Sequence, residues 1–113
     1  MQKLKIFIFF SFSILFSQDY ALEDLNPSST TFGQDVGVSY FSNKVTVHYF
    51  GHYNWGLCTT RFGELNEYME DWSTADYPVQ LIGVGKSAHM SYLGNWIDPN
   101  DAPVCADQSG FSG

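Results

Sequence analysis

Apolar and polar residues alternate along residues 44–50, "KVTVHYF", and this period of two predicts a β-strand. The segment is dense in β-branched and aromatic residues, which favour strands. One face of the strand would carry Val45, Val47 and Tyr49, and the other Thr46, His48 and Phe50. This is the first strong strand of the chain.

A helix is predicted after the loop "GHYN", because the apolar spacing changes there. Steps of three, four and three residues place one apolar stripe on Phe62, Leu65, Met69 and Trp72. The opposite face is most simply a solvated surface, since it carries Arg61, Glu64, Glu67, Glu70 and Asp71. Cys58 lies four residues before Phe62, so we expect it on the inward stripe, in the first turn.

A second strand, residues 79–84, has the near-continuous apolar character of a buried parallel strand, "VQLIGV". Strand, helix and strand together predict a βαβ unit with a right-handed crossover. Ser87 is then expected to cap a short helix that ends near Trp96. A turn at 98–101 and a third core strand at 102–106, "APVCA", complete an α/β pattern with parallel strands.

The residues before this core divide into two parts. Residues 19–43 form a lead-in rich in turn formers, in which the alternation of Val36, Val38 and Tyr40 predicts a short, half-buried strand. Residues 1–18 have a basic start, an apolar stretch at 6–16 and a polar exit, which is typical of a secretory signal. The apolar stretch is shorter than the ~20 residues that cross a bilayer. An uncleaved anchor or a buried N-terminal strand are the alternatives.

Charge and cysteine content narrow the possible partners. The net charge is −7, and removal of residues 1–18 takes away two lysines and no acid, which leaves −9. So acidic a chain should repel nucleic acid and anionic membranes. A cleaved signal predicts a secreted or periplasmic protein, in a compartment where disulfides persist. Its two cysteines are too few for a disulfide-stapled scaffold.

The spacing around "YNWGLC" supplies a family resemblance. Counted from Phe50, Trp55 stands at +5 and Cys58 at +8. This register resembles the thioredoxin-like superfamily, in particular exported redoxins and the N-terminal domain of selenoprotein P. In those proteins a strand ending in Phe is followed by four residues and then Cys-x-x-Cys at a helix start. Trp55 departs from the pattern, because it stands where the first cysteine would be.

Other segments extend the resemblance over about residues 20 to 107. The stretch "RFGELNEYMEDW" resembles the helix after the motif, and "VQLIGVGK" resembles the next parallel strand. The lead-in "LEDLNPSSTTFGQDV" is similar to that of exported redoxins, and "APVCAD" to the strand that follows the second helix. The resemblance implies that residues 44–113 are a partial thioredoxin-like domain. The family's fold would continue with a helix, a cis-proline loop, a β-hairpin and a final helix.

The function implied by the resemblance is that of a thiol (or selenol) disulfide oxidoreductase without cofactor or metal, whose partners are protein or small-molecule thiols and disulfides. Residue 55 would attack a disulfide and Cys58 would resolve the mixed disulfide. Tryptophan cannot attack, so the chain as written is expected to lack dithiol exchange. One alternative is a redox-inactive binding module with Trp55 in an apolar contact surface. Another is a peroxiredoxin-like peroxidase that uses Cys58, although Gly51 and Trp55 replace that family's Pro and Thr/Ser.

Codon 55 bears directly on this departure. The resemblance implies that some relatives carry selenocysteine at the first motif position, and selenocysteine is encoded by UGA. Tryptophan is UGG and cysteine is UGU or UGC. We hypothesise that Trp55 is either a one-base substitution or a UGA codon translated as tryptophan. A UGG codon with no selenocysteine insertion element nearby would exclude the second version.

Several residues remain open to more than one interpretation. Cys58 and Cys105 form a disulfide or stay unpaired, because the sequence does not fix a Cα separation below ~7 Å. Cys58 is also open to interpretation as a simple buried helix cysteine. His48 and His52 have a spacing that binds zinc on a helix, but a strand and a loop would keep them apart, and His89 is distant. His52 either stabilises a thiolate or is a solvated loop residue.

Overall fold

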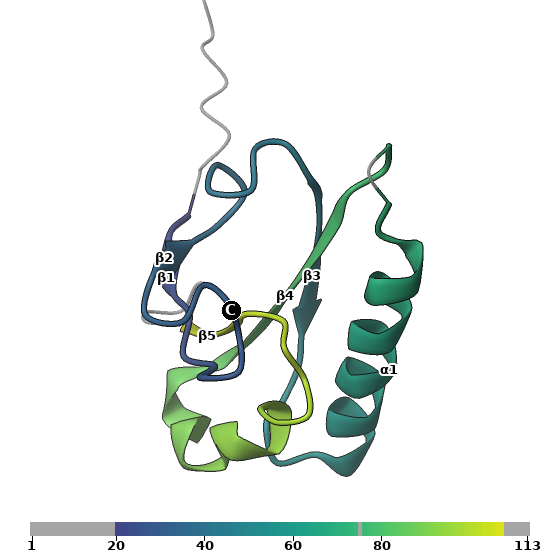
Figure 1. Cartoon of the computed structure of the whole chain (residues 1–113). Helices are drawn as coiled ribbons and strands as arrows, with labels where there is room; N and C mark the ends of the chain where they lie inside the picture. Colours follow the sequence, from purple (N-terminus) through teal and green to yellow (C-terminus); the bar gives the residue numbers. More distant parts are fainter. Residues whose placement is uncertain (1–19, 75, 108–113) are drawn as a thin grey trace, which may run out of the picture.

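A three-stranded parallel sheet forms the centre of the computed structural model, which describes residues 20–74 and 76–107. The strands are β3 (Val45–Phe50), β4 (Val79–Lys86) and β5 (Val104–Asp107), in the order β3-β4-β5 (Figure 1). The predicted mixed α/β class with parallel strands is therefore confirmed. The expected signal peptide, residues 1–18, lies outside the described residues.

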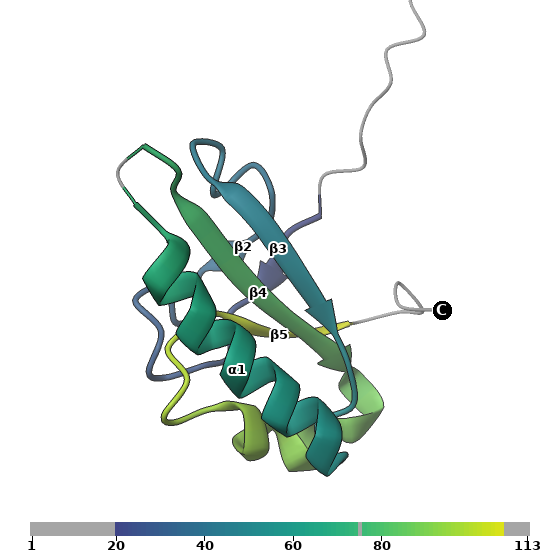
Figure 2. The same ribbon diagram turned by 90° about the vertical axis from the view of Figure 1, so that its right-hand side faces the viewer.

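The two faces of the sheet are covered by different parts of the chain. Helix α1 (Gly56–Trp72) lies across one face, as predicted for a βαβ unit (Figure 2). The lead-in covers the other face and contains the short antiparallel strands β1 (Leu22–Glu23) and β2 (Asp35–Val36). The 3-10 helix η1 (Ser87–Trp96) connects β4 to β5 near the end of the sheet where β3 and β4 finish.

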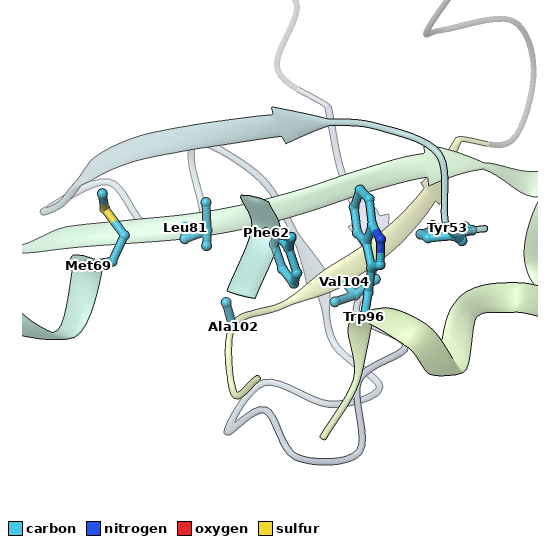
Figure 3. Packing of buried hydrophobic residues seen from close by; sticks show 7 residues of the cluster. All are labelled: Tyr53, Phe62, Met69, Leu81, Trp96, Ala102 and Val104. Carbon is cyan, nitrogen blue, oxygen red and sulfur yellow. The ribbon is translucent and has the colours of Figure 1, made fainter. Parts of the chain in front are cut away.

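An aromatic layer occupies the α1 face of the sheet. Phe62 stacks on Trp96 with ring centroids 4.7 Å apart, and Tyr53 meets the edge of Trp96 at 4.9 Å (Figure 3). These rings lie directly on β4, because Gly83 and Gly85 have no side chain there. A Cβ at Gly83 would lie 2.6 Å from the Phe62 ring, and one at Gly85 would overlap the Tyr53 ring. The glycines of the "IGVG" segment of β4, residues 82–85, are therefore needed for close approach of the aromatic rings.

The hydroxyl of Tyr53 ties the loop after β3 to the sheet. It accepts a hydrogen bond from the Gly85 N–H at 3.1 Å and donates one to the Cys105 carbonyl. Burial raises the pKa of Tyr53, so the hydroxyl stays protonated and remains a donor. A single side chain thus joins β4 and β5 to residues 51–55, which lead into α1.

The opposite face has a second apolar cluster, in which Val36 and Phe41 of the lead-in pack on Ile82, Val84 and Cys105. A buried polar pair fixes the lead-in here. The Asp24 carboxylate accepts from the Val104 N–H at 3.1 Å, and the Asn26 side-chain amide donates to the Asn100 and Ala102 carbonyls. This network was not predicted, although buried polar side chains are expected to be hydrogen-bonded when they occur.

The predicted stripe of α1 is wrong at Trp72. Phe62 and Met69 are buried and Leu65 packs against the core, but Trp72 is 61% exposed. It is the last residue of the helix and stacks on Tyr68 instead of the sheet. Asn66 is buried on the inner side, where its Oδ1 accepts from the Ala102 N–H at 2.9 Å.

Three smaller predictions also need correction. The lead-in strand stops at Val36, because the chain turns after it and leaves Val38 and Tyr40 exposed. The segment 87–96 is a 3-10 helix, and Ser87 is its first residue and not its cap. The third strand begins at Val104, two residues later than expected, since the Ala102 N–H bonds to Asn66 outside the sheet.

The close approach at Gly85 predicts the cost of a single methyl group. Gly85→Ala should lower the free energy of unfolding by about 1–3 kcal/mol, because its Cβ overlaps the Tyr53 ring and overpacking has this cost. Gly94→Ala is the matched control, since no atom lies within 4 Å of a Cβ there. Urea denaturation measures both. Equal stability of the two variants would contradict this packing.

Candidate functional site

A pocket of about 410 Å³ lies at the carboxyl ends of β3 and β4, the end at which open α/β sheets bind ligands. Both sequence-predicted site residues, Trp55 and Cys58, line it. The remaining lining residues come from the end of β3, the following loop, the end of β4 and η1: Phe50, Gly51, His52, Val84, Gly85, Lys86 and His89.

Cys58 is the third residue of α1 and is half-buried, with part of its side chain packed against the aromatic core. The prediction that it lies in the first turn is confirmed. The helix begins after Trp55, which is the N-cap residue and has an extended backbone (φ −92°, ψ 120°). Its side chain makes no capping hydrogen bond. Free N–H groups and the dipole at such a terminus favour a negative charge nearby, which suits a reactive thiol.

Tyr49 is a site residue that sequence analysis did not identify. Its hydroxyl donates to the Cys58 carbonyl at 3.2 Å. Burial, followed by the charge and hydrogen bonding of the Cys58 thiol, raises the pKa of Tyr49 to about 12. A protonated donor therefore stands beside Cys58 at neutral pH. The alternation along β3 could have identified it, because Tyr49 shares a face with Val45 and Val47, and α1 covers that face.

His52 is held in the pocket by two ring contacts. It stacks on Trp55 at 5.2 Å and on His89 at 3.8 Å, measured between ring centroids. Its Nδ1 accepts from the Asn54 N–H at 3.0 Å, which leaves Nε2 to carry the proton of the neutral ring. Burial, then His89 and Lys86, lower the pKa of His52 below 6.5. The ring is therefore neutral at pH 7, and its Nε2–H is a hydrogen-bond donor in the pocket that Cys58 also lines.

Trp55 forms an outer wall of the pocket. Its side chain is 63% exposed and stacks on His52 with an angle of 9° between the rings. Leu57, two residues after Trp55 in the chain, is also exposed. Phe50, the last residue of β3, is exposed as well. The position that would attack in a dithiol site thus presents an aromatic surface.

Cys105 does not belong to this site. Both cysteines are free, and they lie on opposite faces of the sheet: Cys58 packs on the α1 side and Cys105 on the lead-in side. The disulfide alternative is therefore wrong for this structure, because the sheet separates the two side chains. Burial, then the charge of Asp24, raise the pKa of Cys105 to about 12. This thiol is chemically quiet at neutral pH.

The three histidines do not form a metal site. His48 lies on the lead-in face of β3, where its ring meets the edge of Tyr20, while His52 and His89 lie in the pocket. Burial lowers the pKa of His48. Within residues 20–74 and 76–107, no group of three or more His, Cys, Asp or Glu side chains is arranged to hold a metal ion.

The sequence matches no protein-family model, and no curated protein or solved structure shows significant similarity to it. None of the helices in the described part of the chain is long and apolar enough to cross a membrane.

The environment of His52 predicts how this ring titrates. We expect a pKa below 6.5 in the folded chain, so its contribution to stability is present above pH 6.5 and decreases as the pH falls below that value. Lys86→Gln should raise the pKa of His52 part of the way toward 6.5, because the positive charge of Lys86 no longer opposes protonation of the ring. NMR titration of the histidine Cε1–H signals measures both values.

Lys44→Gln is the control for this titration, since Lys44 precedes β3 at the other end of the sheet. An unchanged His52 pKa in the Lys86 variant, or an equal change in the Lys44 variant, would contradict the local effect.

Proposed function

We propose that this chain is a thioredoxin-like redoxin domain whose working thiol is Cys58. The observation that carries the proposal is the location of Cys58: in the first turn of the βαβ helix, lining a pocket at the carboxyl ends of parallel strands. The "YNWGLC" register, counted from Phe50, supports the same assignment. Its substrates would be protein or small-molecule disulfides, met in a secreted or periplasmic location.

The chemistry follows from which groups surround the sulfur. A thiolate at Cys58 attacks a disulfide, and the helix N-terminus stabilises the charge. The Tyr49 hydroxyl holds the Cys58 carbonyl, and the His52 ring lines the same pocket. Trp55 supplies no second sulfur, so the mixed disulfide needs an external thiol to release it. With Cys or selenocysteine at position 55, that residue would attack and Cys58 would resolve, which is the complete dithiol cycle.

A binding module is the second candidate, and the exposed apolar side chains favour it. Trp55 and Phe50, which line the pocket, are 63% and 53% exposed, and Leu57, next to Cys58 in the chain, is 69% exposed. Such exposure of large apolar groups is typical of a contact surface. In this function the fold would be kept while Cys58 takes no part in turnover.

Restoration of the missing sulfur distinguishes the two candidates. Trp55→Cys should turn the chain into a disulfide reductase that undergoes several turnovers with dithiothreitol, because position 55 is at the mouth of the pocket and Cys58 lies one helical turn away. The chain with Trp55 should give one mixed disulfide per molecule and at least tenfold slower turnover. An insulin-reduction assay measures both.

Cys58→Ser in the Trp55→Cys background is the control and should return turnover to the slow rate of the Trp55 chain, because only dithiothreitol then releases the mixed disulfide. An inactive Trp55→Cys variant that still folds would overturn the oxidoreductase proposal in favour of the binding module. Rapid consumption of hydrogen peroxide by the Trp55 chain would instead support peroxidase chemistry at Cys58.

A further inference from the structure

The outer edge of β3 is a part of the sheet to which no other described strand is bonded. We propose that this edge pairs with the β3 edge of a second copy of the chain, antiparallel and about a two-fold axis at His48. The two three-stranded sheets would then form one continuous sheet. This inference goes beyond the proposed thiol chemistry and does not depend on it.

The hydrogen-bonding groups of β3 divide between its two sides. The Val45 N–H donates to the Pro78 carbonyl at 2.9 Å, and the parallel register with β4 repeats this pattern at each odd-numbered residue of β3. Three even-numbered residues therefore direct their N–H and carbonyl groups away from β4: Thr46, His48 and Phe50. Among the residues that the structure describes, these backbone groups have no hydrogen-bond partner. Such a row of free groups is a template for another strand.

The opposite edge of the sheet is covered by the lead-in. The Leu25 N–H donates to the Val104 carbonyl at 2.8 Å, and the Val104 N–H donates to the Asp24 carboxylate at 3.1 Å. Every residue of β5 is buried, whereas no residue of β3 is. The sheet thus has its open edge at β3 (Figure 2). With the other edge covered, two-fold pairing closes at two copies.

β3 lacks the features by which edge strands usually avoid pairing. Such strands carry lysines, prolines or bulges, and the "VTVHYF" of β3 has none of these. Lys44 directly precedes the strand, but its ammonium group is directed toward β4. It donates to the Gln80 Oε1 at 3.5 Å and lies 5.6 Å from the centre of the Phe41 ring. This lysine therefore does not block the outer edge.

The distribution of charge favours a second copy as the occupant. The chain has twelve acidic residues, but residues 36–63, which include β3, contain none. Two copies can therefore pair through this segment without bringing its own side chains into acidic repulsion, although each copy has a net charge of −7. Burial lowers the pKa of His48, so the two imidazoles that meet at the axis are neutral at pH 7.

The edge is complementary to itself when His48 lies opposite His48 of the second copy. Thr46 of each copy then lies opposite Phe50 of the other, and the outward groups form about six hydrogen bonds. On the α1 face, Val47 lies opposite Tyr49. Pairs of β-branched and aromatic residues are favourable across antiparallel strands. A shift by two residues would instead pair Thr46 or Phe50 with a residue outside β3.

Sedimentation equilibrium of the full chain and two variants of Thr46 tests the proposal. Thr46→Pro removes an outward N–H and keeps every bond to β4, because the Thr46 N–H does not point toward β4. Thr46→Val removes the same hydroxyl and keeps the N–H. We expect a dimer whose dissociation constant rises by about tenfold or more in Thr46→Pro, since two hydrogen bonds are lost. Thr46→Val should change it by less than about twofold.

A cysteine on the two-fold axis tests the register, and does so even if Thr46→Pro fails to fold. The background is Cys58→Ser, in which the remaining Cys105 is buried. His48→Cys should form an intermolecular disulfide under mild oxidation, because the Cα atoms of a hydrogen-bonded pair lie about 5.5 Å apart. Thr46→Cys is the matched control. Its two copies would lie about 14 Å apart along the strands and should not be linked.

Each contrary outcome overturns the proposal. A chain that stays monomeric would leave the β3 edge to an extended segment of another protein. A dimer that both Thr46 variants weaken equally would use another surface, since residues 1–18 and all other segments are the same in both. Equal linking of Thr46→Cys and His48→Cys would contradict the axis at His48, and oligomers larger than a dimer would contradict the closed pair.

Discussion

The packing of aromatic rings on the bare backbone of β4 is the constraint on which the rest of the structure depends. Gly83 and Gly85 leave room for Phe62, Trp96 and Tyr53, and the Tyr53 hydroxyl then joins β4 to β5. Phe62 lies one helical turn after Cys58, and Tyr53 lies between His52 and Trp55. Each ring that rests on a glycine thus also sets the location of a pocket residue. The core therefore positions the segments that carry the site, and the ring contacts of His52 with Trp55 and His89 add to this.

The same sheet gives its two cysteines different chemistry. Cys58 lies at a helix N-terminus and borders a pocket, beside the Tyr49 hydroxyl. Cys105 is fully buried among apolar side chains on the other face, and its pKa is raised to about 12. Desolvation disfavours a thiolate, which explains the raised pKa of Cys105. The sheet also keeps the two sulfurs apart, so that neither cysteine protects the other as a disulfide.

The predictable parts of this structure are those that depend on periodicity. Alternation at 44–50, the apolar run at 79–84 and the helical stripe between them were enough to predict β3, β4, α1 and the first-turn location of Cys58. The register from Phe50 identified positions 55 and 58, which the fold then placed in one pocket. Both results rest on local spacing, which the parallel βαβ arrangement preserves in space.

The remaining features depend on contacts between distant segments, which spacing does not encode. No local spacing indicated that Lys86 and His89 would lie near His52, because a crossover helix separates them along the chain. Asn66 is buried because its Oδ1 accepts from the N–H of Ala102, 36 residues away, at a position for which the apolar stripe made no prediction. The prediction that Trp72 is buried was wrong, because α1 ends at this residue and the sheet does not cover its side chain.

The central claim is that Cys58, and not Cys105, is the working thiol of this fold. It is tested most directly by treatment of the native chain with one equivalent of a small disulfide, followed by proteolysis and mass spectrometry. The account predicts that the label is found on Cys58, with Cys105 modified about a thousandfold more slowly until urea unfolds the chain. Equal labelling of both cysteines in the native state, or labelling of Cys105 first, would contradict it.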